Sequence, residues 1–290
     1  MLELEQDTLT RIRELLPTFS KGQKRIAAFI LESYDKAAFM TASKLGQTVG
    51  VSESTVVRFA VELGYSGYPS MQKSLQKMIR SRLTSVQRLE IANDQIGDQD
   101  VIESVLRGDM AMIRGTLEEL DRREFDLAVD KLISARRIYV LGARSSSAVA
   151  HFLSVHLNLI LDRVCEVSAN SNGEIFEQIF RMEKGDVLLT VSFPRYSSRT
   201  VKAMQFAKDR GATVITLTDG LASPVSAAAD VKLIAKSGVT SFVDSLAAPM
   251  SVANALIVAA SRRCGNSVTK TLEQLEAIWD EYDVYQKMDG

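Results

Sequence analysis

Residues 41–72 read TASKLGQTVGVSESTVVRFAVELGYSGYPSMQ, and this stretch decides how the first third of the chain folds. Apolar residues recur at helical spacing on both sides of Gly50, where glycine permits the left-handed backbone of a tight turn. Ser52 is placed to cap the second of the two predicted helices, and Gly64 to end it. A short helix, a turn and a second helix form the pattern of a helix-turn-helix.

The second helix, predicted over 52–64, has two faces of different chemistry. Its buried face is predicted to consist of Val56, Val57, Ala60 and Leu63. Its outward, N-terminal side would carry Ser52, Glu53, Ser54, Thr55 and Arg58. In a helix-turn-helix this end enters the major groove, where arginine reads guanine and short hydroxyls reach bases or phosphates. Contacts to DNA phosphates are predicted for Lys44, Lys73, Lys77, Arg80 and Arg82.

The net charge of −1 hides an asymmetry along the chain. Residues 20–82 carry ten Lys/Arg against four Asp/Glu, a net charge of +6. Residues 89–135 carry five Lys/Arg against twelve Asp/Glu, a net charge of −7. This difference predicts that only the first segment faces a polyanion, although charge alone would also fit a basic surface without a partner.

The quoted stretch also resembles the N-terminal domain of the RpiR family of bacterial regulators. The resemblance rests on Ala42-Ser-x-Leu45, Val51-Ser52, Ser54-Thr55-Val56-Val57-Arg58-Phe59, Leu63-Gly64-Tyr65 and Gly67-Tyr68. It implies a helix-turn-helix domain over 1–80 that binds an operator in double-stranded DNA, with repression favoured over activation. Within this domain, Ser20 and Gln23 fit a capping box that opens an earlier helix.

Residues 81–125 are predicted to form a helical connector because they contain no proline and few glycines. Apolar residues recur there at intervals of three and four, namely Val101, Ile102, Val105, Leu106, Met110, Ile113, Leu117 and Leu120. The pattern favours helix packing or dimerisation over a ligand site. A break is expected at 93–98.

From about residue 126 strands alternate with helices, which predicts an open parallel sheet with helices on both faces, a three-layer α/β/α domain. Strands are expected at 137–142, 186–192, 213–218 and 231–235, and helices at 198–210 and 246–264. Ligands of such sheets lie beyond the carboxyl ends of the strands. A short helix over 270–287 is predicted to dock through Trp279 and Tyr282.

Hydroxyl groups are concentrated after two of these strands, in Gly142-Ala-Arg-Ser-Ser-Ser147 and Ser192-Phe-Pro-Arg-Tyr-Ser-Ser-Arg-Thr200. Helix N-termini with serine hydroxyls form anion sites, and Arg144, Arg195 and Arg199 would add positive charge. The chain has no GxGxxG or GxxxxGK[ST] motif, which disfavours a dinucleotide or a nucleoside triphosphate. Alternatively, the serines only cap helices.

Residues 126–266 resemble the SIS (sugar isomerase) domain, the usual C-terminal partner in the RpiR family. Gly142, Ser146 and Ala150 match its G-x-x-x-S-x-x-x-A element, and Ser192 and Ser197 match the outer hydroxyls of S-x-S-G-x-[ST]. Pro194 and Arg195 depart from that second element, which leaves the ligand's identity open. The resemblance implies a phosphosugar-like effector held by Gly142, Arg144, Ser145, Ser146, Ser192, Arg195, Ser197 and Thr200, with Ser241 near the pocket or a dimer contact.

SIS domains also occur in isomerases, so a phosphosugar isomerase with a helical appendage is the alternative. Isomerisation needs a base, for which Glu174 in the loop 170–174 is the best candidate, while His151 and His156 are expected to be structural. The sequence contains no metal-binding motif, and we expect no cofactor. A DNA-binding module fused upstream favours a domain that senses a ligand over one that catalyses a reaction. With two cysteines and no signal peptide or membrane span, we expect a cytoplasmic homodimer or homotetramer, with 267–290 as a helical tail.

Overall fold

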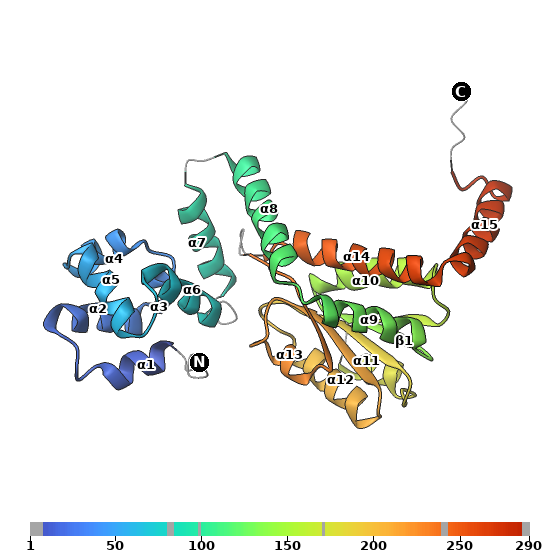
Figure 1. The fold of residues 1–290 in the computed structure, drawn as a ribbon, viewed down its shortest axis with the longest axis horizontal. Helices are drawn as coiled ribbons and strands as arrows, with labels where there is room; N and C mark the ends of the chain where they lie inside the picture. Colours follow the sequence, from blue (N-terminus) through green and yellow to red (C-terminus); the bar gives the residue numbers. More distant parts are fainter. Residues whose placement is uncertain (1–7, 80–83, 98–99, 170–171, 239–242, 286–290) are drawn as a thin grey trace. The chain divides into compact units, whose positions relative to one another are not determined.

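The computed structural model describes residues 8–79, 84–97, 100–169, 172–238 and 243–285. The chain divides into two compact units, the first containing Met1–Gln99 and the second almost all of the chain from Asp100 onward. Each unit has its own hydrophobic core, so each is described by itself. Figure 1 shows a helical first unit and a second unit built around a sheet.

Between Thr8 and Gly97, every element of the first unit that the structure describes is a helix, as the sequence predicts. Its helices are α1 (Thr8–Leu15), α2 (Lys21–Glu32), α3 (Tyr34–Ala37), α4 (Ala42–Val49), α5 (Glu53–Glu62), α6 (Tyr68–Ile79) and α7 (Ser85–Ile96). The capping box before α2 is confirmed: the Ser20 hydroxyl accepts from the Gln23 amide, and the Gln23 side chain accepts from the Ser20 amide. This cap fixes where α2 begins and thereby the angle at which it joins the core.

The buried face of α5 differs from the predicted one at a single position. Val56, Ala60 and Leu63 are fully buried as expected, but Val57 is 38% exposed and Phe59 is fully buried in its place. The ring of Phe59 lies 5.0 Å from that of Phe19. Each residue turns a helix by about 100°, so Val56, Phe59, Ala60 and Leu63 share one face, while Val57 points away from it.

The second unit contains a five-stranded, all-parallel sheet with strand order β2-β1-β3-β4-β5. Its strands are β1 (Ile138–Gly142), β2 (Val164–Val167), β3 (Val187–Val191), β4 (Thr213–Thr218) and β5 (Val231–Ile234). Four of these were predicted, and β2 was missed. It is a short edge strand in which Cys165 and Glu166 are exposed, so it lacks the apolar run of a central strand.

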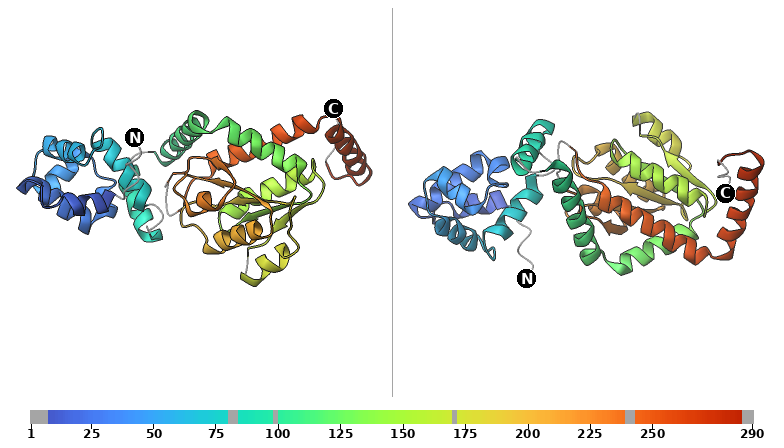
Figure 2. Two further views of the ribbon diagram at one scale, coloured as in Figure 1. Left: turned by 60° about the horizontal axis from the view of Figure 1, so that its bottom comes forward. Right: turned by 90° about the horizontal axis from the view of Figure 1, so that it is seen from above.

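Helices cover both faces of this sheet, which confirms the predicted three-layer arrangement (Figure 2). One face packs against α9 (Arg122–Ser134), α10 (Ser146–Asn158) and α14 (Ala247–Cys264). The other packs against α11 (Asn172–Ile179), α12 (Ser198–Asp209) and α13 (Pro224–Ala228). The long helix α8 (Val101–Glu119) precedes α9 and contacts α14.

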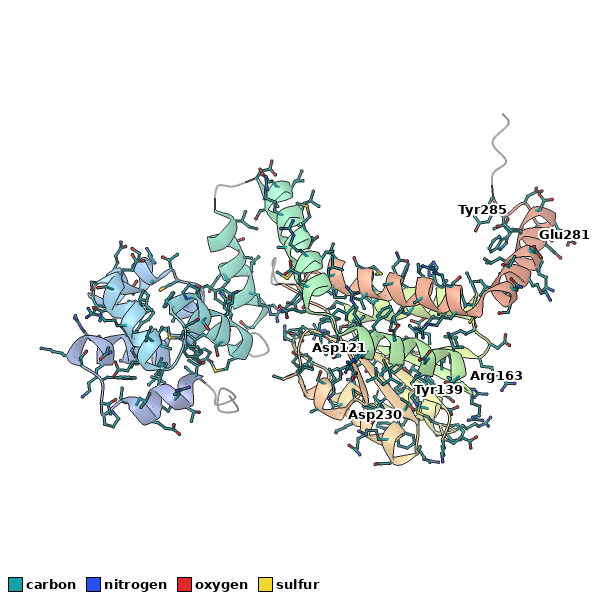
Figure 3. The ribbon with its side chains drawn as sticks, in the orientation of Figure 1. Asp121, Tyr139, Arg163, Asp230, Glu281 and Tyr285 are labelled. Carbon is teal, nitrogen blue, oxygen red and sulfur yellow. The ribbon has the colours of Figure 1, made fainter. Side chains whose placement is uncertain are left out.

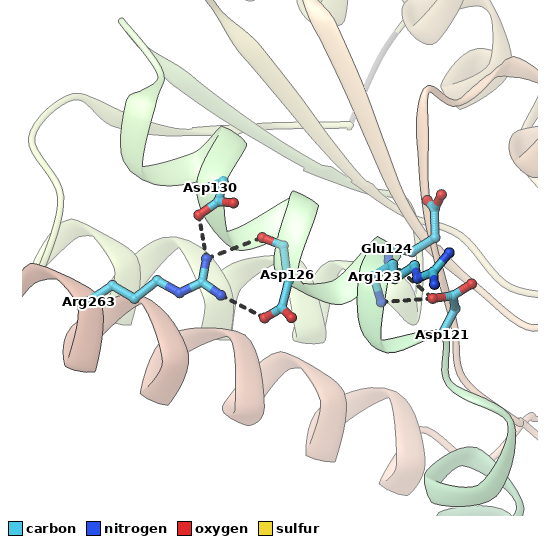
Figure 4. A network of polar contacts seen from close by, with 6 residues as sticks. All are labelled: Asp121, Arg123, Glu124, Asp126, Asp130 and Arg263. Carbon is cyan, nitrogen blue, oxygen red and sulfur yellow. Dashed lines mark hydrogen bonds and ion pairs between the residues drawn. The ribbon is translucent and has the colours of Figure 1, made fainter.

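Polar contacts hold α9 in place on the unit (Figure 4). Arg263, near the end of α14, donates to the carboxylate of Asp126 at 2.6 Å and also pairs with Asp130. At the start of α9, the Asp121 carboxylate accepts from the amides of Arg123 and Glu124 and so caps the helix. These exposed ion pairs contribute little stability individually, so their role is to set how α9 lies against α14.

The C-terminal helix α15 (Asn266–Glu281) corrects the prediction that its aromatic residues dock it onto the domain. Tyr282 is 71% exposed, and the Trp279 ring contacts Tyr285 of the same segment at 5.3 Å. In Figure 3 the side chains of Glu281 and Tyr285 lie well away from that of Tyr139 in the sheet. Only Val268 of α15 is buried, and the Trp279 ring packs on Tyr285, which follows the helix. Among the described residues, no helix is long and apolar enough to cross a bilayer.

Candidate DNA-reading helix and anion site

Three short hydroxyl side chains are tied together at the start of α5. Ser52 is the N-cap, and its hydroxyl accepts from the Thr55 amide at 3.3 Å. The same hydroxyl lies 2.9 Å from that of Ser54 and 2.8 Å from that of Thr55. The exposed Arg58 follows one turn later, and its Nε donates to the Ser54 carbonyl at 3.3 Å. The predicted group is thus brought together at the exposed end of α5, together with Glu53.

The close packing of α4 on α5 depends on two glycines. A Cβ at Gly46 would lie 2.8 Å from the Val51 carbonyl oxygen, closer than such atoms approach. Gly50 ends α4 with φ of 68°, in the left-handed region, as the sequence predicts. Without a side chain at either position, the turn between the helices stays short and α5 is held firmly against α4.

The exposed face of α5 also carries two valines that the sequence analysis did not assign to it. Val57 is partly exposed and Val61, one turn later, is 54% exposed. Both lie on the side of Ser54 and Arg58, since positions three and four apart share a helix face. Placing residues 53–62 on a helical wheel would have revealed them. The surface that α5 offers therefore combines hydroxyls, one guanidinium and apolar methyl groups.

The other predicted DNA contacts come from neighbouring helices. Lys44 lies in the first turn of α4, where its amide donates to the Thr41 cap at 3.1 Å, and Lys73 is exposed on α6. Arg80, Arg82 and the side chain of Lys77 lie outside the described residues, as does Ser241. The first unit thus places two exposed lysines on two of the helices that contact α5.

Tyr68, which belongs to the quoted Gly67-Tyr68 motif, has a structural role. Its hydroxyl donates to the Met40 carbonyl at 2.7 Å, and Gln72 donates to the same oxygen at 2.7 Å. Burial raises the pKa of Tyr68 to about 12, so the side chain remains a neutral donor at any physiological pH. These bonds fix the segment that leads into α4.

The second predicted site lies where two neighbouring strands end. β1 pairs with β3, and Gly142 at the end of β1 lies opposite Val191 at the end of β3. Strand β2 lies on one side of β1, and the chain then crosses over to form β3 on the other side of β1. Such a reversal of strand order opens a crevice at the carboxyl ends, where ligands of these sheets bind. The expectation that both hydroxyl-rich loops lie at adjacent strand ends is confirmed.

After β1 the chain turns directly into α10. A Cβ at Gly142 would lie 2.5 Å from the Ser146 carbonyl oxygen and 2.7 Å from the Ala150 Cβ. The G-x-x-x-S-x-x-x-A spacing therefore reflects a helix pressed against the end of the strand. Ser145 is the N-cap of α10, yet its side chain makes no cap hydrogen bond, and Ser146 is buried beside it. The first three amides of α10, those of Ser146, Ser147 and Ala148, instead bond to carbonyls of the preceding turn.

After β3 the loop is held down before α12 begins. Ser192 is buried, and the Tyr196 hydroxyl donates to the Asp219 carboxylate at 2.7 Å, which ties the loop to the end of β4. Ser197 is the N-cap of α12, and its side chain also makes no cap hydrogen bond. Thr200 is fully buried, and its hydroxyl has no hydrogen-bond partner.

Two arginines in this region have unusual backbone conformations. Arg144 has φ of 56° and Arg195 has φ of 64°, both in the left-handed region that favours glycine. Both side chains are exposed. A non-glycine residue in this region costs on the order of 1 kcal/mol, and such strain is concentrated at ligand-binding sites. The two loops therefore hold positively charged side chains at the strand ends in a conformation that has a cost.

The residues considered for catalysis lie on α10 and α11. Glu174 is exposed in the first turn of α11 rather than in a loop, which corrects the prediction. His151 pairs with Glu166 at 2.7 Å on an exposed face, and His156 bonds to the Phe152 carbonyl at 2.8 Å. Across the described part of the chain, no group of three or more His, Cys, Asp or Glu side chains could hold a metal ion.

Comparison with known proteins defines the class to which this architecture belongs. A model of the helix-turn-helix domain of the rpiR family matches residues 6–82, and a SIS-domain model matches residues 131–259. A DNA-binding head joined to a SIS domain is the architecture of a transcriptional regulator. The chain belongs to the RpiR family of such regulators.

Several relatives extend over most of the chain. An HTH-type transcriptional regulator of Caldanaerobacter subterraneus is 24% identical over 94% of this chain and 96% of its own length. The regulator HexR of Pseudomonas aeruginosa is 28% identical, over 79% of this chain and 78% of its own. Both are named as regulators of transcription, which agrees with the domain matches.

Two solved structures share the fold. Vibrio vulnificus NanR complexed with ManNAc-6P matches with a TM-score of 0.59 and 21% identity, over 98% of this chain and 100% of its own. The sugar isomerase domain of an RpiR transcription factor from Sphaerobacter thermophilus also has a TM-score of 0.59, with 25% identity over 62% of this chain and 99% of its own. The first shares both units of the chain, and the second only the SIS domain.

Proposed function

We propose that this regulator represses transcription by binding an operator through α5, and that a phosphosugar-like anion at the ends of β1 and β3 changes its affinity for that operator. The observation that carries the proposal is the pair of uncapped helix N-termini at neighbouring strand ends. Because the serine side chains there make no cap hydrogen bond, their hydroxyls are available to bind an anion.

The first half of the proposal rests on the surface of α5. Arg58 can donate two hydrogen bonds to guanine, and the methyl groups of Val57 fit the methyl group of thymine. Ser54, Thr55 and the capped end of α5 can contact bases or phosphates at the entrance to the groove. Lys44 and Lys73 would add phosphate contacts that weaken as the salt concentration rises.

The second half rests on the chemistry of the strand ends. A phosphate accepts hydrogen bonds, so the N-terminus of α12 and the hydroxyls of Ser145 and Ser197 suit it. Arg144 and Arg195 would add positive charge around the anion. The similarity to Vibrio vulnificus NanR, whose structure was solved in complex with ManNAc-6P, supports a phosphorylated sugar as the ligand class. We propose binding without turnover, because the chain carries a helix-turn-helix domain and its relatives are named as regulators of transcription.

The two sites would act through linkage in a cytoplasmic homodimer. Helix-turn-helix proteins gain affinity by reading two half-sites, so a change in how two copies pack would change operator affinity. Coupling of this kind is typically about 1 to 3 kcal/mol.

The proposal can be tested in two steps on the full-length protein. Fragments of its own genome are first selected for binding at several salt concentrations, and phosphorylated sugars are screened by their effect on the melting temperature. We expect one enriched, salt-sensitive operator and at least one stabilising sugar phosphate, which is recovered unchanged. The absence of any preferred DNA fragment would refute the proposal that the protein binds an operator. Conversion of the sugar phosphate to another compound would favour an isomerase.

A further inference from the structure

Helix α8 presents an apolar stripe that nothing in its own unit covers. The stripe consists of five side chains that are between 40 and 71% exposed, namely Ile102, Leu106, Met110, Ile113 and Leu117. Their intervals of four, four, three and four residues place them along one side of the helix. Scattered apolar residues are common on protein surfaces, but a continuous stripe over four turns marks a contact surface.

The helix cannot bury this stripe by rotating, because the side of the helix next to the stripe is already bonded to the sheet domain. The Lys236 amide donates to the Thr116 hydroxyl at 2.8 Å, and the Ser245 hydroxyl donates to the Asp109 carboxylate at 2.5 Å. Met112 packs close to Gly238. Rotation of α8 would break all three contacts, so the unit holds α8 with its stripe facing outward.

The area of the stripe is sufficient for a symmetric pair. Five exposed side chains of roughly 100 Å² each give about 500 Å² per copy and about 1,000 Å² for two copies, which is where specific interfaces begin. Other parts of the domains would add to this area. A stripe of this size therefore suits a stable dimer better than a transient complex.

The spacing of the stripe matches a second copy of itself. Ile102 and Leu117 lie equally far from a point between Asp109 and Met110, and so do Leu106 and Ile113. A two-fold axis at that point would bring each apolar side chain against another, with the two Met110 side chains side by side. Beside the stripe, the exposed Glu103, Arg107, Arg114 and Glu118 carry two charges of each sign, so they add no net repulsion.

We propose that this stripe of α8 is where a second copy of the chain docks. The stripe would be the contact surface of the homodimer in the proposed function. This inference rests on the proposed function only for the expectation that the regulator is dimeric. The surface lies just before the SIS core, since α8 leads into α9 at Arg122. A change in the sheet domain that moves α8 would therefore move the pairing surface itself.

Disulfide trapping tests the contact directly. In full-length protein carrying Cys165→Ser and Cys264→Ser, Met110→Cys is expected to form a covalent dimer under mild oxidation, since Met110 would face its own copy. The matched control is Ala111→Cys, on an exposed position turned about 100° away from Met110. We expect at least tenfold more cross-linking for M110C than for A111C. Equal cross-linking, or none, would overturn the inference.

Sedimentation gives an independent readout. The double variant Leu106→Glu with Leu117→Glu is expected to shift the protein from dimer to monomer, while Ala111→Glu on the same helix leaves the dimer intact. Unchanged circular dichroism and melting behaviour would show that the double variant is folded. A monomeric wild type, or a dimer that survives both substitutions, contradicts the inference. A dimer held by α8 that binds neither DNA nor sugar phosphate would instead contradict the proposed function alone.

Discussion

Serine and a left-handed residue appear together both before α5 and at the ends of β1 and β3, but they are used differently. In the first unit the Ser52 hydroxyl is occupied in capping α5, and the left-handed residue in the turn is Gly50. At the strand ends Ser145 and Ser197 cap nothing with their side chains, and the left-handed residues are arginines. The first arrangement suits a rigid support for α5, and the second leaves its polar groups available for a ligand.

The largest expected effect concerns the close approach that shapes the ligand loops. Gly142→Ala should lower the free energy of unfolding of the second unit by about 2 to 3 kcal/mol, because its Cβ would collide with the backbone of α10. Urea unfolding followed by circular dichroism measures the loss. Gly173→Ala in α11 is the control, since its Cβ would meet only the end of Glu177 at 3.7 Å. Equal stability of the two variants would contradict this account of Gly142.

Next in size is the loss of base reading by α5. Arg58→Ala should weaken binding to the operator by about 2 kcal/mol, roughly thirtyfold, and abolish discrimination against mutated sites. Lys73→Ala should instead weaken binding to all sequences alike and reduce the slope of affinity against salt by about one. Fluorescence anisotropy on matched and scrambled duplexes separates the two outcomes. Retained selectivity in R58A would show that another residue reads the bases.

A pair of serine variants tests the comparison itself. Ser52→Ala removes a cap and should cost the first unit about 1 kcal/mol, seen as faster hydrogen exchange in α5. Ser197→Ala removes no cap bond, so exchange in α12 should stay unchanged while sugar-phosphate binding weakens. Faster hydrogen exchange in α12 of S197A would show that the Ser197 hydroxyl has a structural role, and the difference between Ser52 and Ser197 would disappear.

The smallest effect concerns backbone strain at Arg195. Arg195→Gly should be more stable than Arg195→Ala by about 0.5 to 1 kcal/mol, because glycine relieves the left-handed strain but loses more chain entropy on folding. Since both variants lose the side chain, their difference reports the backbone alone. Thermal unfolding of the two proteins measures it. An alanine variant that is equally stable would mean that the loop relaxes without strain.

The fold could be predicted where local chemistry decides it. Ser20 with Gln23 and the Gly50 turn involve neighbours in sequence, and the apolar runs of β1, β3, β4 and β5 are typical of buried parallel strands. The edge strand β2 was missed because it is only four residues long and its two central residues, Cys165 and Glu166, are exposed, so it has no apolar run. The assignment of Val57 failed because both adjacent valines were placed in the core on apolar character alone, whereas the helical turn of about 100° between them puts only Val56 on the buried face.

For the candidate site, the sequence supplied the residues but not their conformation. Adjacent strand ends follow from the order of strands in a sheet, so the two serine clusters could be placed together. Left-handed arginines could not be foreseen, because sequence propensity assigns that region to glycine. The sequence also could not predict that Ser145 and Ser197 make no cap hydrogen bond, because a serine at the start of a helix ordinarily caps it.

The most direct test of the account is one titration. The affinity of the full-length protein for its selected operator is measured with and without a saturating concentration of the sugar phosphate that raises its melting temperature. Linkage between the strand-end site and α5 predicts a change in the dissociation constant of about five- to 150-fold, and a much smaller change in S197A. An identical dissociation constant with and without bound sugar would contradict it.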